Sequence, residues 1–276
     1  MKKRSLAFPS SVRFTVAAFG ACLSLVATFP RAGAEKPNII FILTDDLGYG
    51  DVGVLFQKQR EGVQVQTPEL DEMAGAGTIL NRHYCPAPIC APSRASLITG
   101  MHQGHTNVRN MQFDKAIEDN WNFANTLQKV GYHTIHLGKY GLQGWGHDPE
   151  KWAGYPTKRG FDYFYGYVRH VDGHQHYPAN EWALGDNRSH QGKKQVWENN
   201  EEVSAGLDKC YTTDLWTAKA KQLIISETKE NPGRPFFMFL SYDTPHAALQ
   251  LPTVAYPVGK GVKGGIQWLG KPGKMI

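Results

Sequence analysis

The chain has 276 residues, of which 41% are hydrophobic and 12% aromatic, a composition that excludes disordered and collagen-like proteins. Its 30 Lys and Arg exceed its 25 Asp and Glu by five, but residues 1–34 alone contain five basic residues and no acidic one. The remaining 242 residues are therefore neutral, so the basic balance gives no support for a nucleic-acid partner.

The first 34 residues have the three parts of a secretory signal: the basic start Lys2–Arg4, an apolar run over residues 14–29, and the cleavage site Ala32–Ala34. We predict cleavage after this site, so that residues 35–276 are exported, either to the periplasm or as a secreted protein. A membrane anchor is the alternative, but the apolar run is shorter than the roughly 20 residues of a spanning helix. No later stretch is apolar enough to cross a membrane.

Export permits disulfide bonds, and cleavage leaves the three cysteines Cys85, Cys90 and Cys210. An odd number leaves at least one thiol without a partner in the chain. A bridge between Cys85 and Cys210 is allowed but not required. Lipid attachment at Cys22 is disfavoured because the apolar run continues past it.

The first predicted elements place polar groups at their ends. Residues 38–43 form a six-residue apolar run that predicts a buried strand, and this strand leads directly into Asp45 and Asp46. A helix is predicted over residues 92–99, because proline suits the first turn and Gly100 suits the position after the last.

The next elements deliver a lysine. Apolar residues at helical spacing over 123–130 predict a helix that Gly131 ends. Residues 133–137 predict a short strand, and Lys139 follows just past its end. Residues 145–206 are aromatic and polar with weak periodicity, so we predict a long excursion from the sheet. Its aromatic side chains over 161–182 would either stack on a sugar or aryl ring or form part of the core.

A longer helix is predicted from Asp214, as its N-cap, to Pro232, and residues 236–240 predict a buried strand that delivers Asp243 and His246. Strands that alternate with helices predict an α/β fold, with a mostly parallel central sheet and helices on both faces. The ligand crevice of such a sheet lies beyond the carboxyl ends of its strands, where these polar residues fall.

The segment Cys90-Ala91-Pro92-Ser93-Arg94 carries the strongest chemical signal. A nucleophile at a helix amino terminus sits where backbone N–H groups and the helix dipole stabilise negative charge, which suits attack on an anionic ester. Arg94 would add a positive charge one turn along. Ordinary packing of a buried cysteine before a helix is the alternative.

With these features the chain resembles the formylglycine-dependent sulfatases of the alkaline phosphatase superfamily. The resemblance rests on four motifs in family order: residues 37–48, residues 90–100, Gly138-Lys139 and Pro245-His246. It implies an alkaline phosphatase-like fold and hydrolysis of sulfuric esters, either sulfated carbohydrates or aryl sulfates. It also implies a formylglycine-generating enzyme as the maturation partner, which converts Cys90 to formylglycine, whose hydrated form is the nucleophile.

The resemblance further implies roles for the neighbouring residues. Asp45 and Asp46 resemble the first pair of metal ligands, for Ca²⁺ or alternatively Mg²⁺, with the modified Cys90 on the same metal. Arg94 would hold the nucleophile, Lys139 the sulfate and His246 the ester oxygen. A turn or helix cap is the alternative for adjacent aspartates.

The chain departs from the family pattern in the lysine motif. Many relatives have a histidine two residues after the lysine, where this chain has Gly141. We hypothesise that His174 or His176 replaces it as the general acid for the leaving group. A surface or structural role for both histidines is equally open.

A second departure concerns the metal ligands that relatives supply from further downstream. No Asp or Glu follows Asp243, so the chain would provide only part of a calcium site that takes about six to eight oxygens. We therefore expect residues 35–276 to be an incomplete amino-terminal catalytic domain that binds metal weakly and turns over slowly or not at all. The alternatives are a phosphonate or phosphodiester hydrolase and a catalytically silent protein that binds sulfate or glycans.

Overall fold

The structure is a computed structural model that describes residues 35–111, 115–178, 194–207 and 210–246. The described residues from Pro37 onward belong to one compact unit. The predicted signal peptide and the tail after His246 lie outside the described residues. None of the helices in the described ranges is long and apolar enough to cross a membrane.

The centre of the fold is a six-stranded sheet with the order β1-β6-β2-β3-β4-β5. Neighbouring strands among β1, β6, β2 and β3 are parallel, whereas β4 and β5 pair in antiparallel fashion at one end. The prediction of a mostly parallel sheet is confirmed. The strands are β1 (Ile39–Asp45), β2 (His133–Lys139), β3 (Tyr163–Tyr167), β4 (Val196–Glu198), β5 (Glu201–Glu202) and β6 (Phe236–Pro245).

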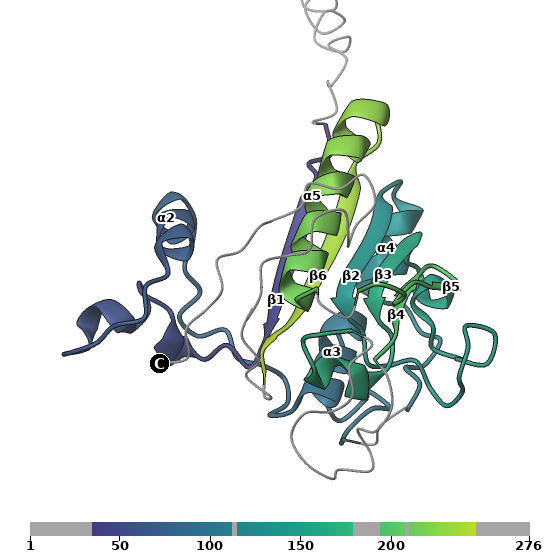
Figure 1. Cartoon of the computed structure of the whole chain (residues 1–276), viewed down its shortest axis with the longest axis horizontal. Coiled ribbons are helices and arrows are strands. Elements are labelled where there is room, and N and C mark those ends of the chain that lie inside the picture. The colour runs from purple at the N-terminus through teal and green to yellow at the C-terminus, as the bar shows by residue number, and fades with distance from the viewer. Residues whose placement is uncertain (1–34, 112–114, 179–193, 208–209, 247–276) are drawn as a thin grey trace, which may run out of the picture. The chain divides into compact units, whose positions relative to one another are not determined.

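Helices cover both faces of this sheet, as predicted (Figure 1). Strand β6 shows the division, because Phe237 and Phe239 face one core cluster and Met238 faces the other. The first cluster includes residues of α3 and α4, and the second includes residues of α5. The helices are α2 (Pro68–Ala76), α3 (Cys90–Thr99), α4 (Phe123–Lys129) and α5 (Thr212–Glu230), with short 3₁₀ turns η1 (Tyr49–Asp51), η2 (Gln57–Gln59), η3 (Pro156–Arg159) and η4 (His170–His174).

The predicted helix ends are partly right. Gly100 follows α3 in the left-handed conformation, with φ of 67°, which glycine adopts without strain. However, α3 begins at Cys90, two residues before the predicted start, so the cysteine is the first helical residue. Helix α5 begins at Thr212 with Tyr211 as its N-cap, and Asp214 lies within the first turn instead of at the cap. Helix α2, preceded by Thr67, was not predicted.

The segment over residues 145–206 is not an excursion from the sheet, contrary to the prediction. Its described part contributes β3, β4 and β5, and β3 pairs in parallel with β2 from Ile135 to Lys139. The aromatic strand Tyr163–Tyr167 shows no polar–apolar alternation in the sequence, because four of its five residues are buried and both of its faces are apolar. Aromatic residues are well suited to such a strand.

Strand β1 was predicted to be buried, and this was wrong. Its apolar side chains Ile40, Phe41 and Ile42 are 45%, 38% and 55% exposed. Among the described residues β1 pairs only with β6, so it is an edge strand of the sheet. A continuous apolar run is typical of a strand covered on both faces, and the described residues supply less cover than that run predicts.

A fully buried histidine lies inside the first core cluster. The ring of His136 on β2 packs against four aromatic rings, with centroids 4.9–5.4 Å away: Tyr140, Phe161, Phe164 and Phe239. Burial among these rings, with the nearby charge of Arg94, lowers the pKa of His136 from 6.5 to about 3. The native fold therefore holds this imidazole neutral.

The burial of His136 among these four rings predicts a loss of stability in mild acid. A base whose pKa is lower in the folded state stabilises the fold above its unfolded pKa, about 6.5, and below that pH the unfolded chain gains a proton that the native chain does not. The slope approaches about 1.4 kcal/mol per pH unit for one such group. We expect His136→Leu to reduce the slope of the unfolding free energy against pH between about pH 6.5 and 4.5, as measured by denaturant unfolding at each pH. An unchanged slope would show that the buried His136 takes up a proton in the folded chain.

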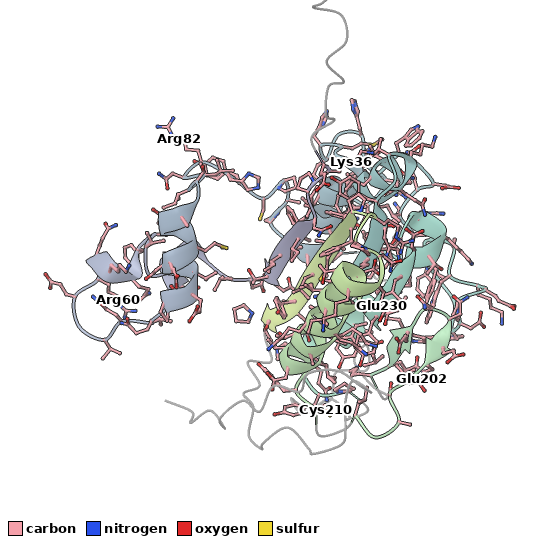
Figure 2. The ribbon with its side chains drawn as sticks, turned by 90° about the horizontal axis from the view of Figure 1, so that it is seen from above. Lys36, Arg60, Arg82, Glu202, Cys210 and Glu230 are labelled. Carbon is pink, nitrogen blue, oxygen red and sulfur yellow. The ribbon has the colours of Figure 1, made fainter. Side chains whose placement is uncertain are left out.

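The described cysteines do not form the permitted bridge. Cys85 is exposed, whereas Cys210 is buried in the second core cluster just before α5 (Figure 2). No disulfide joins them in the structure. The thiol of Cys90 is half-buried at the start of α3.

Candidate active site

The carboxyl ends of the central strands converge near the amino terminus of α3 (Figure 1). Asp45 is the last residue of β1 and Lys139 is the last residue of β2. Asp243 lies two residues before the end of β6 and His246 follows that strand. Parallel strands end at the same edge of a sheet, which brings these residues together.

Asp45 is held by two cations. Its Oδ2 atom lies 2.6 Å from Nζ of Lys139 and 3.4 Å from a terminal nitrogen of Arg94. The Lys139 side chain is fully buried and that of Arg94 is 3% exposed. Burial would raise the pKa of the Asp45 carboxyl, but the charges of Lys139 and Arg94 outweigh it and hold the pKa well below its usual range. The group is therefore ionised at neutral pH.

Arg94 also ties α3 to two strands. Its guanidinium donates to the backbone oxygen of Lys139, at 2.8 Å, and to the hydroxyl of Ser241. The backbones of β2 and β6 approach closely at this point, since a Cβ on Gly138 would lie 2.0 Å from the oxygen of Ser241. Arg94 and Gly138 thus fix the position of the Lys139 backbone, from which its side chain reaches Asp45.

Cys90 occupies the first position of α3, pointing its sulfur at a histidine. Its Sγ lies 3.0 Å from Nε2 of His170 and 4.0 Å from the sulfur of Met111. Burial would raise the pKa of this thiol, but a hydrogen bond with His246 and the charge of Lys139 outweigh it and lower the pKa below its ordinary value. The site therefore favours negative charge on the atom carried at this position.

Three histidines surround Cys90. The His174 ring stacks on that of His246, with centroids 4.6 Å apart and planes 7° apart. His170 lies nearly perpendicular to His174, with centroids 5.2 Å apart. His246 also places Nε2 3.6 Å from Oδ2 of Asp46. The structure therefore brings the predicted residues His174 and His246 to the same place as Cys90.

His176 is directed elsewhere. Its Nδ1 lies 3.0 Å from Oδ2 of Asp243, and its Nε2 lies 3.0 Å from the backbone oxygen of His246. Asp243 is fully buried and also accepts hydrogen bonds from Thr212 and Trp216. Burial would lower the pKa of His176, but Asp243 outweighs it and the pKa is raised. Asp243 thus joins β6 to α5, and His176 contacts both Asp243 and the backbone of His246.

Residue His170 was not singled out from the sequence, although the polar stretch that contains it was. It is fully buried, and its Nε2 atom lies 3.0 Å from the Cys90 sulfur. The signal that would have identified it is its spacing, four residues before His174, within one short turn that follows β3. Burial and the charge of Lys139 keep the pKa of His170 well below its usual value.

The donors present fit a hard cation only in part. Asp45 and Asp46 are oxygen donors, the kind that Ca²⁺ and Mg²⁺ prefer. Asp45 faces two cations, while the Asp46 side chain is 66% exposed and its backbone φ is 65°. The oxygens of these two carboxylates are fewer than the roughly six to eight oxygens that calcium takes.

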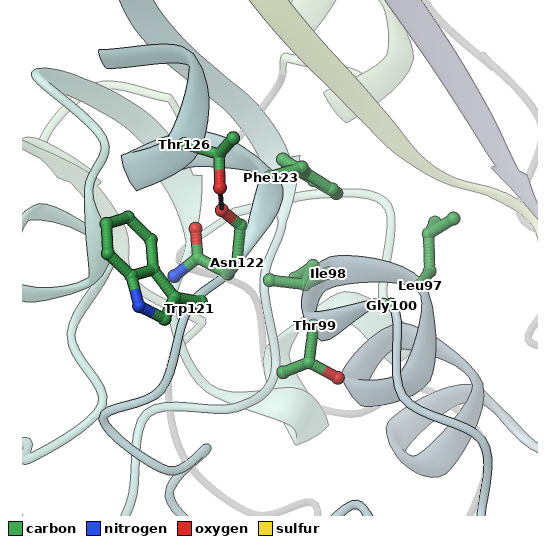
Figure 3. A pocket seen from close by; sticks show the side chains of 8 residues that line it. All are labelled: Leu97, Ile98, Thr99, Gly100, Trp121, Asn122, Phe123 and Thr126. Carbon is green, nitrogen blue, oxygen red and sulfur yellow. Dashed lines mark hydrogen bonds between the residues drawn. The ribbon is translucent and has the colours of Figure 1, made fainter. Parts of the chain in front are cut away.

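A cavity of about 260 Å³ lies at the opposite end of α3 (Figure 3). Its walls come from the end of α3 and the start of α4, where Thr126 donates to the backbone oxygen of Asn122. None of the eight described residues that line it has an ionisable side chain. It therefore offers none of the charged groups found around Cys90.

A family model described as Sulfatase matches residues 37–263. The chain belongs to the sulfatase family. Mouse arylsulfatase J is 32% identical to this sulfatase over 227 residues, which cover 80% of this chain and 34% of that protein. Human arylsulfatase G is 30% identical over 260 residues, which cover 86% of this chain and 47% of that protein.

A solved structure shares the fold of this chain. The complex of Ps i-CgsB with k-i-k-neocarrahexaose matches the sulfatase chain with a TM-score of 0.62 and 29% identity, and the match covers 78% of this chain and 46% of that one. The α/β fold predicted from the sequence is confirmed by the mostly parallel sheet and by this match. The chain thus spans less than half the length of the relatives named here.

Proposed function

We propose that this sulfatase chain is the amino-terminal part of a sulfuric ester hydrolase whose nucleophile is carried by Cys90. One observation carries the proposal: Cys90 begins α3 at the point where Lys139, Arg94 and His246 meet. A helix amino terminus with two fixed cations suits a tetrahedral anion such as sulfate. The conversion of Cys90 to formylglycine, which the family resemblance implies, would supply a hydrated aldehyde as the attacking hydroxyl.

The other residues have roles that follow from their positions. Lys139 and Arg94 would offset negative charge on the sulfate oxygens. His174 and His246, stacked beside Cys90, are placed to hold a proton near the leaving oxygen. His176 is a positioning residue in this proposal, because it contacts the His246 backbone and Asp243.

Asp45 and Asp46 would hold the divalent cation, calcium or magnesium, together with oxygens from outside the described residues. A bound cation would polarise the sulfate and favour the ionised nucleophile. Asp45 must then share its carboxylate between the metal and Lys139. The chain alone is expected to bind this cation weakly.

The state of Cys90 provides the direct test. Trypsin releases residues 83–94, a peptide that contains Cys85 and Cys90 together. After co-expression with a formylglycine-generating enzyme, we expect fragment mass spectrometry to show loss of sulfur and gain of an aldehyde at Cys90, with Cys85 unchanged as the internal control. An intact thiol at Cys90 would contradict the proposal.

The choice between His174 and His176 as general acid has a kinetic test. With the converted chain, we expect His174→Ala to lower kcat/KM by about 10²–10⁴ for a sulfate ester with a poor leaving group, and much less for an activated aryl sulfate. His176→Ala should affect both esters alike and lower the thermal midpoint. Equal losses on both esters for His174→Ala would remove it from this role.

A second candidate is a catalytically silent protein that binds sulfate or glycans. It is favoured by the described carboxylates, because Asp45 and Asp46 supply only part of the oxygens that calcium takes and Asp45 is already paired with two cations. Comparing an aryl sulfate, an aryl phosphate diester and a non-hydrolysed sulfated sugar distinguishes the possibilities. Turnover of the first supports a sulfatase, turnover of the second supports a diesterase, and binding without turnover supports the silent protein.

The substrate class within the proposal is a sulfated carbohydrate or aryl sulfate. The named relatives include arylsulfatases, and one structural relative holds an oligosaccharide, k-i-k-neocarrahexaose. Export to the periplasm or medium also belongs to the proposal. It is supported by the three-part leader at residues 1–34.

A further inference from the structure

A different ligand set is present at the start of α3 while Cys90 keeps its sulfur. The Sγ of Cys90 lies 3.0 Å from Nε2 of His170. One ligand atom from each of Cys90, His170 and His174 lies within 4.8 Å of the other two. The two histidines are the first and last residues of η4, so one short turn holds both beside the helix.

The distances suit a small four-coordinate ion after modest side-chain rotation. Zinc binds thiolate sulfur at about 2.3 Å and imidazole nitrogen at about 2.0–2.1 Å, which places the sulfur and a nitrogen of a tetrahedral site about 3.6 Å apart and two nitrogens about 3.3 Å apart. The distance between the Cys90 sulfur and the His170 nitrogen would increase by about 0.6 Å, and no distance between two ligand atoms would decrease by more than about 1.5 Å. Three protein ligands leave one position for water or another donor, as at many zinc sites.

The surroundings set the expected strength. His170 is fully buried and His174 is 7% exposed, so both rings are ordered before any ion binds. Lys139 and Arg94 oppose a further cation, but each is paired with Asp45. A thiolate would offset one charge of the ion. We therefore expect binding that is specific but weaker than in a site free of nearby cations.

We propose that Cys90, His170 and His174 form a site for a borderline-soft divalent cation of the zinc class in the thiol form of the chain. Sulfur and imidazole ligands select such ions, whereas the carboxylates Asp45 and Asp46 suit hard cations. Binding replaces the thiol proton, which passes to solvent. Conversion of Cys90 removes the sulfur, so occupancy by this ion and conversion exclude each other.

Cobalt(II) is the spectroscopic probe for this site. The full chain is produced without a formylglycine-generating enzyme, kept reduced with a phosphine and titrated with Co²⁺. We expect one equivalent to give a near-ultraviolet sulfur-to-cobalt band and the intense visible bands of four-coordination, both removed by Zn²⁺. Weak bands of a six-coordinate ion, with no sulfur band, would overturn the proposal. The readout needs no turnover, so it is independent of the sulfatase proposal.

Matched variants assign the ligands. Cys90→Ser, which replaces only sulfur by oxygen, should remove the sulfur band and weaken binding at least about tenfold, and His174→Ala should weaken binding by a similar factor. Cys85→Ser and the double variant His102→Ala with His105→Ala are controls, because these side chains lie outside the site, and their spectra should not change. A sulfur band that survives Cys90→Ser, or that disappears in Cys85→Ser, would contradict the assignment. Circular dichroism checks that each variant is folded. If His174→Ala is unfolded, the result for Cys90→Ser alone tests the assignment.

Discussion

Replacing Asp45 with Asn is expected to destabilise the metal-free chain by about 3–5 kcal/mol, because it leaves the buried ammonium of Lys139 without its charge partner. That ammonium lies 2.6 Å from the carboxylate, and its side chain is fully buried. The neighbouring Asp46→Asn is the matched control. Its carboxyl is 66% exposed and 3.6 Å from His246, so we expect a change within about 0.5 kcal/mol. Urea unfolding of both variants measures the difference.

The pairing itself is tested by a second substitution. Replacing both residues, with Asp45→Asn and Lys139→Met together, should cost less than the sum of the two single variants, because the double variant contains neither the Lys139 ammonium without its carboxylate nor the carboxylate without that ammonium. Arg94 loses the Asp45 carboxylate in the Asp45→Asn variant and in the double variant alike, so this loss cancels in the comparison. Its hydrogen bonds to the backbone oxygen of residue 139 and to Ser241 involve neither substituted side chain. Additive losses, or equal losses for Asp45→Asn and Asp46→Asn, would show that the buried pair does not set the stability of this region.

Replacing Gly138 with Ala is expected to lower stability by on the order of 4 kcal/mol, a sum of backbone strain and steric overlap. The residue has φ of 92°, and its new Cβ would lie 2.0 Å from the Ser241 oxygen. The strands must separate to accept it, which displaces Lys139. For a chain of this size the thermal midpoint should fall by about 10 °C.

Gly75→Ala provides the control for this substitution. Gly75 lies inside α2, and a Cβ there would meet no atom within 4 Å. Alanine is favoured over glycine in a helix interior, so this variant should be more stable by about 0.5–1 kcal/mol. Thermal unfolding of both variants separates the local clash from any general effect of adding a methyl group. A Gly138→Ala chain as stable as the parent would contradict the close approach of β2 and β6.

Much of the site follows from sequence because parallel strands end at one edge. The apolar runs before Asp45 and Lys139 predicted strands, and both residues end strands in the structure. The proline and glycine around residues 92–100 predicted α3, which places Cys90 at a helix amino terminus. These patterns are local, so they can be recognised without knowledge of the fold.

Side-chain direction and edge position depend on distant partners and could not be predicted in the same way. Asp45 and Asp46 are adjacent in sequence, yet one is buried and the other exposed, because the backbone leaves β1 between them. Which of His174 and His176 turns to Cys90 is decided by Asp243, which holds His176. The apolar run of β1 indicated burial, but only the pairing order shows that it lies at an edge.

The pairing of β1 with β6 also sets a time scale for synthesis. Phe236 donates its backbone N–H to the side chain of Asn38, 198 residues earlier. At about 5–20 residues per second, β6 leaves the ribosome roughly 10–40 s after β1. Cys90 likewise precedes His170 by 80 residues, or about 4–16 s at this rate. The enzyme proposed to convert Cys90 can therefore bind it in an unfolded segment, before any of its histidine neighbours has been synthesised.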